Sequence, residues 1–204
     1  MFHVDNFSLR SWQAPEDLFL PYILGKKRFV TLELYSNYEE EEEEYKVSPE
    51  LLKILLKDVE VTWKFELRIP VDGDFKYHNP LEHVELRVQE ATWLTIDCLI
   101  DMKCRVLEAT GTLITAQEIR MFIGKWLEGG YETLETLILW NNGTNYEDVC
   151  NGLFSFVEWE RPRIHGRNDC KEGHDIRRSD GLMATIQAKA GRFKFLVWQP
   201  KFLK

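Results

Sequence analysis

The sequence predicts an α/β fold, an irregular leucine-rich-repeat-like solenoid of helix and strand units that ends in an antiparallel β-meander. Two observations predict the solenoid. Apolar residues recur at the spacing L-x-x-L-x-L in five segments, roughly 15 to 35 residues apart, and helical patterns stand between several of them. A third observation predicts the meander, because the chain after residue 173 alternates apolar and polar residues and carries glycine-containing turn signals.

The best-specified unit is residues 113–140, a helix followed by a strand. Thr115 and Glu118 match the capping-box pattern, which satisfies two backbone N–H groups at the start of a helix. The apolar residues after this cap recur at helical spacing, and Gly129-Gly130 predicts the end of the helix. The strand follows with three inward residues, Leu134, Leu137 and Leu139.

The segments before and after this unit repeat the same alternation with less regularity. Strands are predicted at residues 1–12, 26–35, 63–72, 81–88 and 103–113. Helices are predicted at residues 14–25, 49–58, 95–102 and 145–153. The residues expected to point into the core are Leu32, Leu34, Phe65, Leu67, Val84, Leu86, Leu107, Leu137 and Leu139.

We expect one domain over residues 1–204, with the repeats in residues 1–153. Six consecutive glutamates, Glu39 to Glu44, repel one another and predict a flexible, solvated loop at residues 37–46. Residues 154–173 show little periodicity and are expected to form a connecting loop. The meander is expected at residues 174–199, with three strands.

Two turn signals divide the expected meander. Ser179-Asp180-Gly181 predicts a hairpin turn, and Lys189-Ala190-Gly191 predicts a second one. The plausible face residues of the three strands are Ile176, Met183, Thr185, Phe193, Phe195 and Val197.

Composition excludes several classes of function. The net charge of -8 argues against a nucleic-acid backbone as the main partner, because no basic stripe is present to displace counterions. No apolar run approaches the roughly 20 residues needed to span a bilayer, and the N-terminus does not have the apolar core of a signal peptide. The four cysteines form no C-x-x-C pair, which is typical of reduced thiols. We therefore expect no membrane partner and a cytoplasmic or nuclear location.

Three sequence blocks carry a family resemblance. They are ITAQEIRMFIGKWLEGGYETLETLIL, then DIRRSDGLMATIQ, and finally FKFLVW near the end. In this order they resemble the type 2 F-box-associated domain of the nematode F-box proteins. The opening FHVDNFSLRSW and the stretch from Trp93 to Cys104 are also similar to that family, so the resemblance spans nearly the whole chain.

The resemblance implies a non-catalytic protein-binding domain, the substrate-recognition part of a Skp-cullin-F-box ubiquitin ligase subunit. Its partner would be a protein target. Members of the family begin with an F-box that docks a Skp-type adaptor, and residues 1–60 do not resemble one. We therefore expect adaptor binding only if an F-box exists outside this sequence. The alternative is a stand-alone scaffold or decoy protein that has lost the F-box and binds partners without coupling to a ubiquitin ligase.

Candidates for catalysis or metal binding are few, and we expect neither an enzyme nor a cofactor. His165, Cys170 and His174 are close in sequence, but no fourth zinc ligand is apparent near them. His83 is placed at an outward position of its strand. The sequence contains no nucleophile motif of the G-x-S-x-G kind and no phosphate-binding loop.

The predicted strand register defines a candidate partner-binding face. Residues between the inward positions point to the open face of the sheet. They are Glu33, Glu66, Arg68, Glu85, Arg87, Glu108, Ile138 and Trp140. The column of glutamates predicts a partner of mixed or basic charge, with Ile138 and Trp140 as apolar anchors. The meander packing on Trp140 and burying it is the alternative.

Overall fold

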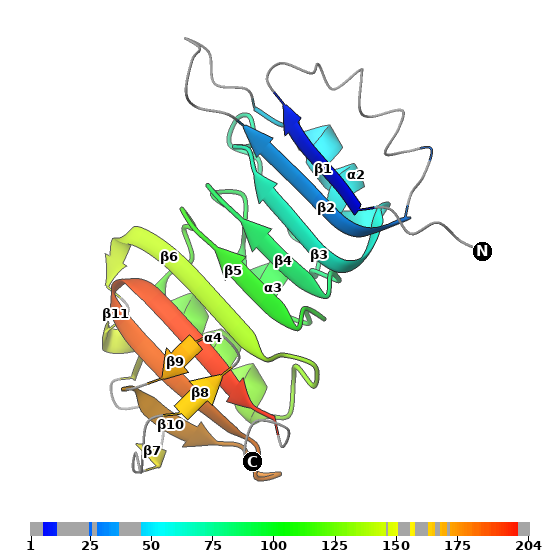
Figure 1. Ribbon diagram of the computed structural model, residues 1–204. Helices are drawn as coiled ribbons and strands as arrows, with labels where there is room; N and C mark the ends of the chain where they lie inside the picture. Colours follow the sequence, from blue (N-terminus) through cyan, green and yellow to red (C-terminus); the bar gives the residue numbers. More distant parts are fainter. Residues whose placement is uncertain are drawn as a thin grey trace, which may run out of the picture.

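A computed structural model gives the fold, and it describes residues 6–11, 25, 28–36, 46–145, 147–150, 156–157, 163–165, 168–170 and 172–199 (Figure 1). The strands are β1 (Asn6–Ser11), β2 (Arg28–Ser36), β3 (Glu60–Arg68), β4 (Glu85–Val88), β5 (Val106–Ala109), β6 (Thr136–Asn145), β7 (Phe156–Val157), β8 (Arg163–His165), β9 (Asn168–Cys170), β10 (His174–Arg177) and β11 (Met183–Trp198). The helices are α2 (Pro49–Lys57), α3 (Ile96–Leu99) and α4 (Ala116–Leu127), with a 3-10 turn η1 (Glu147–Cys150).

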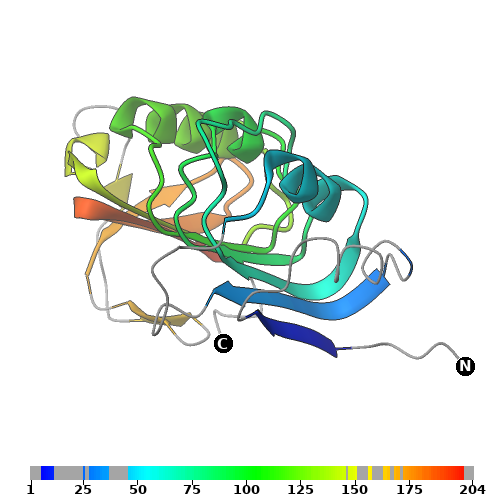
Figure 2. The same ribbon diagram turned by 90° about the horizontal axis from the view of Figure 1, so that it is seen from above.

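Nine strands form one mixed sheet, in the order β1-β2-β3-β4-β5-β6-β11-β10-β7. From β1 to β6, each strand pairs in parallel with the next strand along the chain. The helices α2, α3 and α4 lie together on one face of this sheet (Figure 2). The predicted α/β class is confirmed, and the sequential parallel order follows from the short crossovers between neighbouring strands.

The predicted inward residues form the core between the sheet and the helices. Eight of the nine, from Leu32 on β2 to Leu139 on β6, are fully buried, and Val84 is half-buried. Apolar residues from α2 and α4, such as Leu55 and Phe122, complete this core. Burial of these apolar side chains is the main source of stability for the packing of the helices on the sheet.

Both main helices begin where the sequence predicts. Leu51 N donates to Ser48 Oγ over 3.2 Å at the start of α2, where Pro49 occupies the first turn. At the start of α4, Glu118 N donates to Thr115 Oγ1 and Thr115 N donates to Glu118 Oε2, which completes the capping box. Two shorter helices differ from prediction. The helix α3 ends at Leu99. Of the helix expected at residues 145–153, Asn145 ends β6, Glu147–Cys150 form the 3-10 turn η1, and the rest lies outside the described residues.

The C-terminal part differs from the predicted three-stranded meander. The first predicted turn is present, with Arg178 N donating to Leu182 O between β10 and β11. The second is wrong, because β11 runs unbroken through Gly191 and pairs antiparallel with β6. A register shift between Ala190 and Arg192 accommodates the glycine, whose φ is +69°. A bulge, not a turn, therefore explains this glycine.

Other predictions fall on short or undescribed segments. The segment expected to be a connecting loop contains β7, which pairs with β10, and the small hairpin β8-β9. The helix predicted at residues 14–25 lies outside the described residues except for Gly25, and so does the acidic loop except for Lys46. Among the residues that are described, no helix has the length and hydropathy needed to cross a membrane.

The C-terminal hairpin is fastened to α4 by aromatic contacts and by one buried arginine. Phe195 packs edge-to-face on Phe122 and Trp126, with ring centroids 5.3 and 5.2 Å apart. The Arg178 guanidinium lies 5.4 Å from the Trp126 ring and donates to Gly130 O over 3.0 Å. The same guanidinium donates to Asp180, and this hydrogen bond with that from Leu182 N lowers the Asp180 pKa to about 2. The sequence blocks containing α4, Arg178 and Phe195 therefore meet in one place.

Candidate functional site

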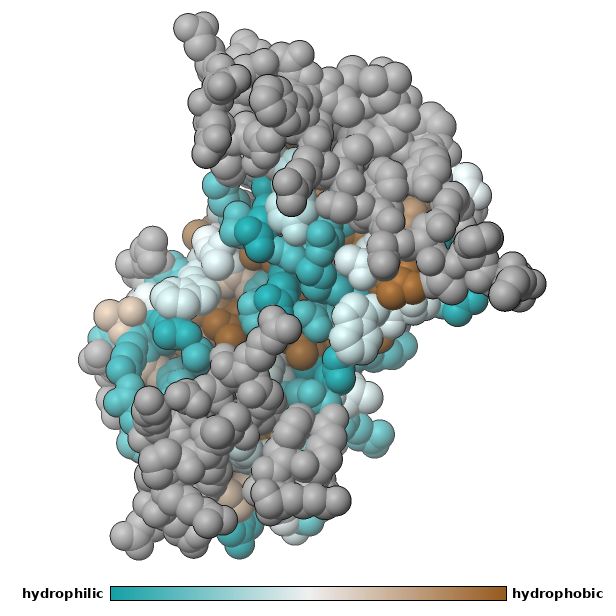
Figure 3. All heavy atoms as spheres, in the orientation of Figure 1, coloured by the Kyte–Doolittle hydropathy of each residue, from teal (hydrophilic) through white to brown (hydrophobic). Residues whose placement is uncertain are grey.

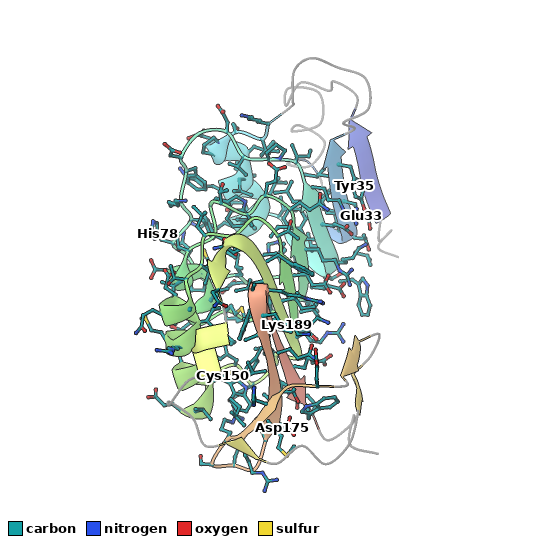
Figure 4. The ribbon with its side chains drawn as sticks, turned by 90° about the vertical axis from the view of Figure 1, so that its left-hand side faces the viewer. Glu33, Tyr35, His78, Cys150, Asp175 and Lys189 are labelled. Carbon is teal, nitrogen blue, oxygen red and sulfur yellow. The ribbon has the colours of Figure 1, made fainter. Side chains whose placement is uncertain are left out.

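The face of the sheet opposite the helices carries the predicted partner-binding residues. Five of them are brought into one row by the strand register, from Glu33 on β2 through Glu66, Arg87 and Glu108 to Ile138 on β6. Glu85 belongs to the neighbouring row, opposite Lys64. Arg68 and Trp140 lie one step nearer the ends of their strands, beside Tyr35 and Arg192 respectively. Figure 4 shows Glu33 and Tyr35 on this side of the sheet and His78 on the helix side.

Lys64 connects the carboxylates at one end of this row. Its amine pairs with Glu33 and, over 2.9 Å, with Glu66, which also accepts from Arg68 Nε at 2.5 Å. Burial acts to raise the Glu66 pKa, but the hydrogen bonds from Lys64 and Arg68 outweigh it, so the pKa is lowered. Burial acts to lower the Lys64 pKa, and the two carboxylates outweigh that effect, so this pKa is raised. Both groups are therefore held in their charged forms.

Arg87 plays the corresponding part in the middle of the sheet. Its Nε donates to Glu85 Oε1 over 2.9 Å, and its Nη1 lies 3.6 Å from Glu108 Oε2. With Lys64 and Arg68, it sets three cations against four predicted carboxylates. Much of the negative charge that the sequence displays on these strands is therefore neutralised within the chain.

The two predicted anchors differ in accessibility. Trp140 is 39% exposed, and the Arg192 guanidinium of β11 lies 4.3 Å from its ring centroid. The C-terminal strand thus contacts Trp140 without burying it. Ile138 is 6% exposed and is flanked in register by Glu108 and Lys194, so its side chain is not accessible in this conformation.

One exposed aromatic residue was not predicted as a site residue. Trp63 is 52% exposed and lies under the Arg105 guanidinium at 5.2 Å. In most units the first two inward residues are three positions apart, whereas Val61 and Phe65 are four apart, and the register with β2 shifts there. This extra residue is the sequence signal that sets Trp63 outside the core.

The open face changes beyond β6. The hairpin β8-β9 lies over this side of β10 and β11 in all three ribbon views (Figures 1, 2 and 4). Leu196 and Trp198, which form a second apolar cluster with Met183, are at most 1% exposed. Over β3 to β6, by contrast, hydrophilic side chains reach the surface with smaller apolar patches between them (Figure 3). The accessible part of this face therefore lies over the parallel strands.

Two chemical groups away from the open face, His83 and Cys104, are buried in the core, whereas the side chains of His165 and Cys170 lie outside the described part of the chain. His83 is 5% exposed and lies against Phe65 at 5.1 Å, so its predicted outward position is wrong. Burial lowers the His83 pKa to about 4 and raises the Cys104 pKa to about 12. Both groups are held neutral near pH 7. Among the described residues, no three His, Cys, Asp or Glu side chains are grouped as metal ligands would be.

Part of the chain matches a known protein family. Residues 76–139, which run from before Tyr77 through β4, β5 and α4 into β6, match the family model described as F-box associated. This part of the chain is therefore similar to the F-box-associated family. This region includes Glu85, Arg87, Glu108 and Ile138 of the open face, whereas Glu33, Glu66 and Trp140 lie outside the matched residues.

A relative with similarity beyond the F-box-associated region comes from a nematode. It is an uncharacterized protein of Caenorhabditis elegans, 22% identical over 149 residues. The alignment covers 66% of this chain and 35% of the relative, so the chain spans about a third of the length of the protein it matches. No solved structure matches the chain.

Proposed function

We propose that this chain recognises a protein target through the open face of its parallel strands, as the non-catalytic substrate-recognition part of a Skp-cullin-F-box ubiquitin ligase subunit. The observation that carries the proposal is the F-box-associated match at residues 76–139. The transfer chemistry would belong to other subunits, and an F-box outside this sequence would supply the contact with a Skp-type adaptor.

The geometry of the open face supports binding of a protein surface. Trp63 and Trp140 are exposed aromatic residues. Arg105, which precedes β5, lies over the Trp63 ring, and Arg192 of β11 lies over the Trp140 ring. Aromatic and arginine side chains are the residue types on which interface energy concentrates. Ion pairs within and between the strands hold charged side chains of this face in place, so little ordering would be needed on binding.

We also propose that β2 to β6 form a leucine-rich-repeat-like array within one domain. Equivalent backbone positions support this description. Asp101 and Tyr131, each six residues before the central inward leucine of its strand, share a left-handed φ of 65° and 61°. Glu90 and Gly111, each four residues after that leucine, have φ of 50° and 66°. Repetition of rare conformations at matched positions is expected of a stacked repeat.

Affinity capture from nematode lysate tests the binding role. The bait is the 204-residue chain, and the variant is Trp63→Ala with Trp140→Ala. Met121→Ala is the matched control, because Met121 is 53% exposed on α4, on the helix side of the sheet. We expect proteins that the chain and the control capture and the double variant does not.

A reconstituted ubiquitylation reaction then tests the ligase role. A captured protein is offered to a Skp-cullin ligase that contains this chain joined behind an F-box of another protein. Modification of the captured protein that depends on Trp63 and Trp140 supports a recognition subunit. Capture without modification would leave a scaffold or decoy, and equal capture by the double variant would refute the open face as the binding site.

A further inference from the structure

We propose that the open face selects an acidic partner segment, whose carboxylates are met by Arg68, Arg87 and Arg105. This inference rests on the proposed function and gives the chemical class of the target. It reverses the expectation of a mixed or basic partner that the glutamate column suggests. The difference lies in which charged groups reach the solvent.

The cations of this face extend further than its carboxylates. The side chains of Arg68, Arg87 and Arg105 are 46%, 38% and 30% exposed. The carboxylates that they pair with are withdrawn, with Glu66, Glu85 and Glu135 only 5%, 12% and 12% exposed. Glu108, at 33%, is the more open carboxylate in this network. A partner approaching from solvent therefore meets guanidinium groups before it meets the buried carboxylates.

The arginines keep hydrogen-bonding capacity after these internal pairs are made. Arg68 directs Nε and Nη2 to Glu66, and Arg87 directs Nε to Glu85. A guanidinium carries five N–H donors, so each group can pair inside the chain and still donate outward. Its planar fork also matches a carboxylate in a bidentate manner. The internal carboxylates thus position the arginines without exhausting them.

Aromatic rings hold two of these guanidinium groups in place. Arg68 lies over Tyr35 at 5.1 Å, and Arg105 lies over Trp63 at 5.2 Å. Stacking of this kind reduces the conformational freedom that a long side chain would lose on binding. The rings also exclude water from one side of each cation, which strengthens its attraction for a carboxylate.

The three arginines lie on, or next to, three successive strands and step along the strand direction. Arg68 ends β3, Arg87 is in the middle row of β4, and Arg105 precedes β5. With strands about 4.8 Å apart and about 3.3 Å per residue along each, the steps between their backbone positions are about 8 and 11 Å. An extended peptide places the side chains of one face about 7 Å apart, so acidic residues at alternate positions come within side-chain reach of successive arginines on this diagonal.

A protein segment fits this face better than a nucleic acid does. The chain as a whole carries a net charge of -8, which opposes a continuous phosphate backbone. A short acidic segment needs only a few local contacts, and repulsion from charges more than about 10 Å away is screened at physiological salt. The arginine N–H donors of the open face, and not the net charge of the chain, therefore decide whether an acidic segment binds.

Selection from a displayed library of random dodecapeptides tests the inference. The full chain is the target, and peptides are counted as face-dependent if the triple variant Arg68→Gln, Arg87→Gln, Arg105→Gln does not retain them. The control removes three charges from the helices, by Lys53→Gln and Lys57→Gln on α2 and Lys125→Gln on α4, so its net charge equals that of the triple variant. A third variant, with lysine at the three arginine positions, keeps the internal ion pairs and shows whether loss of binding reflects misfolding.

We expect face-dependent peptides to be enriched in Asp and Glu, to bind the control as well as they bind the chain, and to weaken as salt rises. Their affinity should fall at least about tenfold in the glutamine variant and less in the lysine variant. Face-dependent peptides of neutral or basic composition would overturn the inference and leave the proposed function standing. Absence of face-dependent peptides would count against both. Tighter binding of the oligonucleotide dT20 than of any acidic peptide would also overturn it.

Discussion

Replacing His83 by leucine should make the fold less sensitive to acid. The imidazole is 5% exposed, between β3 and the helix layer, where it contacts Phe65. Burial lowers its pKa from 6.5 to about 4, because a charged ring would lose its hydration there. Leucine fills a similar volume and cannot be protonated.

The size and sign follow from the two pKa values. Between pH 6.5 and pH 4 the unfolded chain binds a proton at His83 that the folded chain does not, so stability falls as the pH falls. At pH 5 this proton favours the unfolded state by about 2 kcal/mol, and the effect approaches about 3 kcal/mol at lower pH. At pH 7.5 the proton contributes almost nothing, so any difference there measures packing alone.

Urea unfolding at pH 7.5 and pH 5 measures this effect. The loss of unfolding free energy between the two pH values should be about 2 kcal/mol smaller in His83→Leu than in the unmodified chain. The exposed His78 supplies the control, and His78→Gln should keep the full loss. Glu66 does not confuse the comparison, because its lowered pKa places its own loss below this window. Equal losses in the unmodified chain and His83→Leu would refute the reasoning.

Three further changes test the turns and ion pairs. Gly111→Ala should lower the unfolding free energy by about 2 kcal/mol, because φ is +66° and the new Cβ would lie 3.0 Å from the Glu90 Cα. Glu90→Gly should raise the unfolding free energy by about 1 kcal/mol, because Glu90 has a φ of 50° that glycine adopts without strain. Arg178→Ala should cost about 3 kcal/mol by chemical denaturation, since it removes a buried cation, and Arg177→Ala should cost less than 1 kcal/mol. Lys64→Met should cost about 2 kcal/mol at pH 7, measured in the same way.

Each of these changes has an outcome that contradicts it. A Gly111→Ala protein as stable as the unmodified chain would mean that the turn can move away from Glu90 at no cost. Similar losses for Arg178→Ala and Arg177→Ala would show that the contact with α4 does not fasten the hairpin. A stable Lys64→Met protein would show that Arg68 alone can neutralise the buried Glu66 carboxylate.

Sequence patterns predicted the parallel half of the sheet well because its units are local. The capping box at Thr115 and the L-x-x-L-x-L spacing each depend on neighbours within a few residues, and both hold in the structure. The C-terminal half was harder. Gly191 reads as a turn from its neighbours, but pairing with β6, some 50 residues away, keeps the strand continuous and turns the glycine into a bulge.

The candidate site shows a second limit of sequence reasoning. Alternation correctly placed Glu66 and Arg87 on one face, since that depends only on the period of a strand. It could not give the exposure of Glu66, because that depends on Lys64 and Arg68 pairing with the carboxylate. His83 was misplaced because it precedes β4, where the chain is not yet extended and alternation does not apply.

Antiparallel β11 has a consequence for how large a partner contact can be. Strand β11 pairs antiparallel with β6, and its residues Leu196 and Trp198 form a separate apolar cluster with Met183. No further parallel strand can therefore pair with β6. Six parallel strands at about 4.8 Å spacing give the open face a width of about 24 Å, so an extended chain crossing it meets it over about seven residues. The footprint of the proposed target on this surface would therefore be that of a short linear motif, and longer contacts would have to run along the strands.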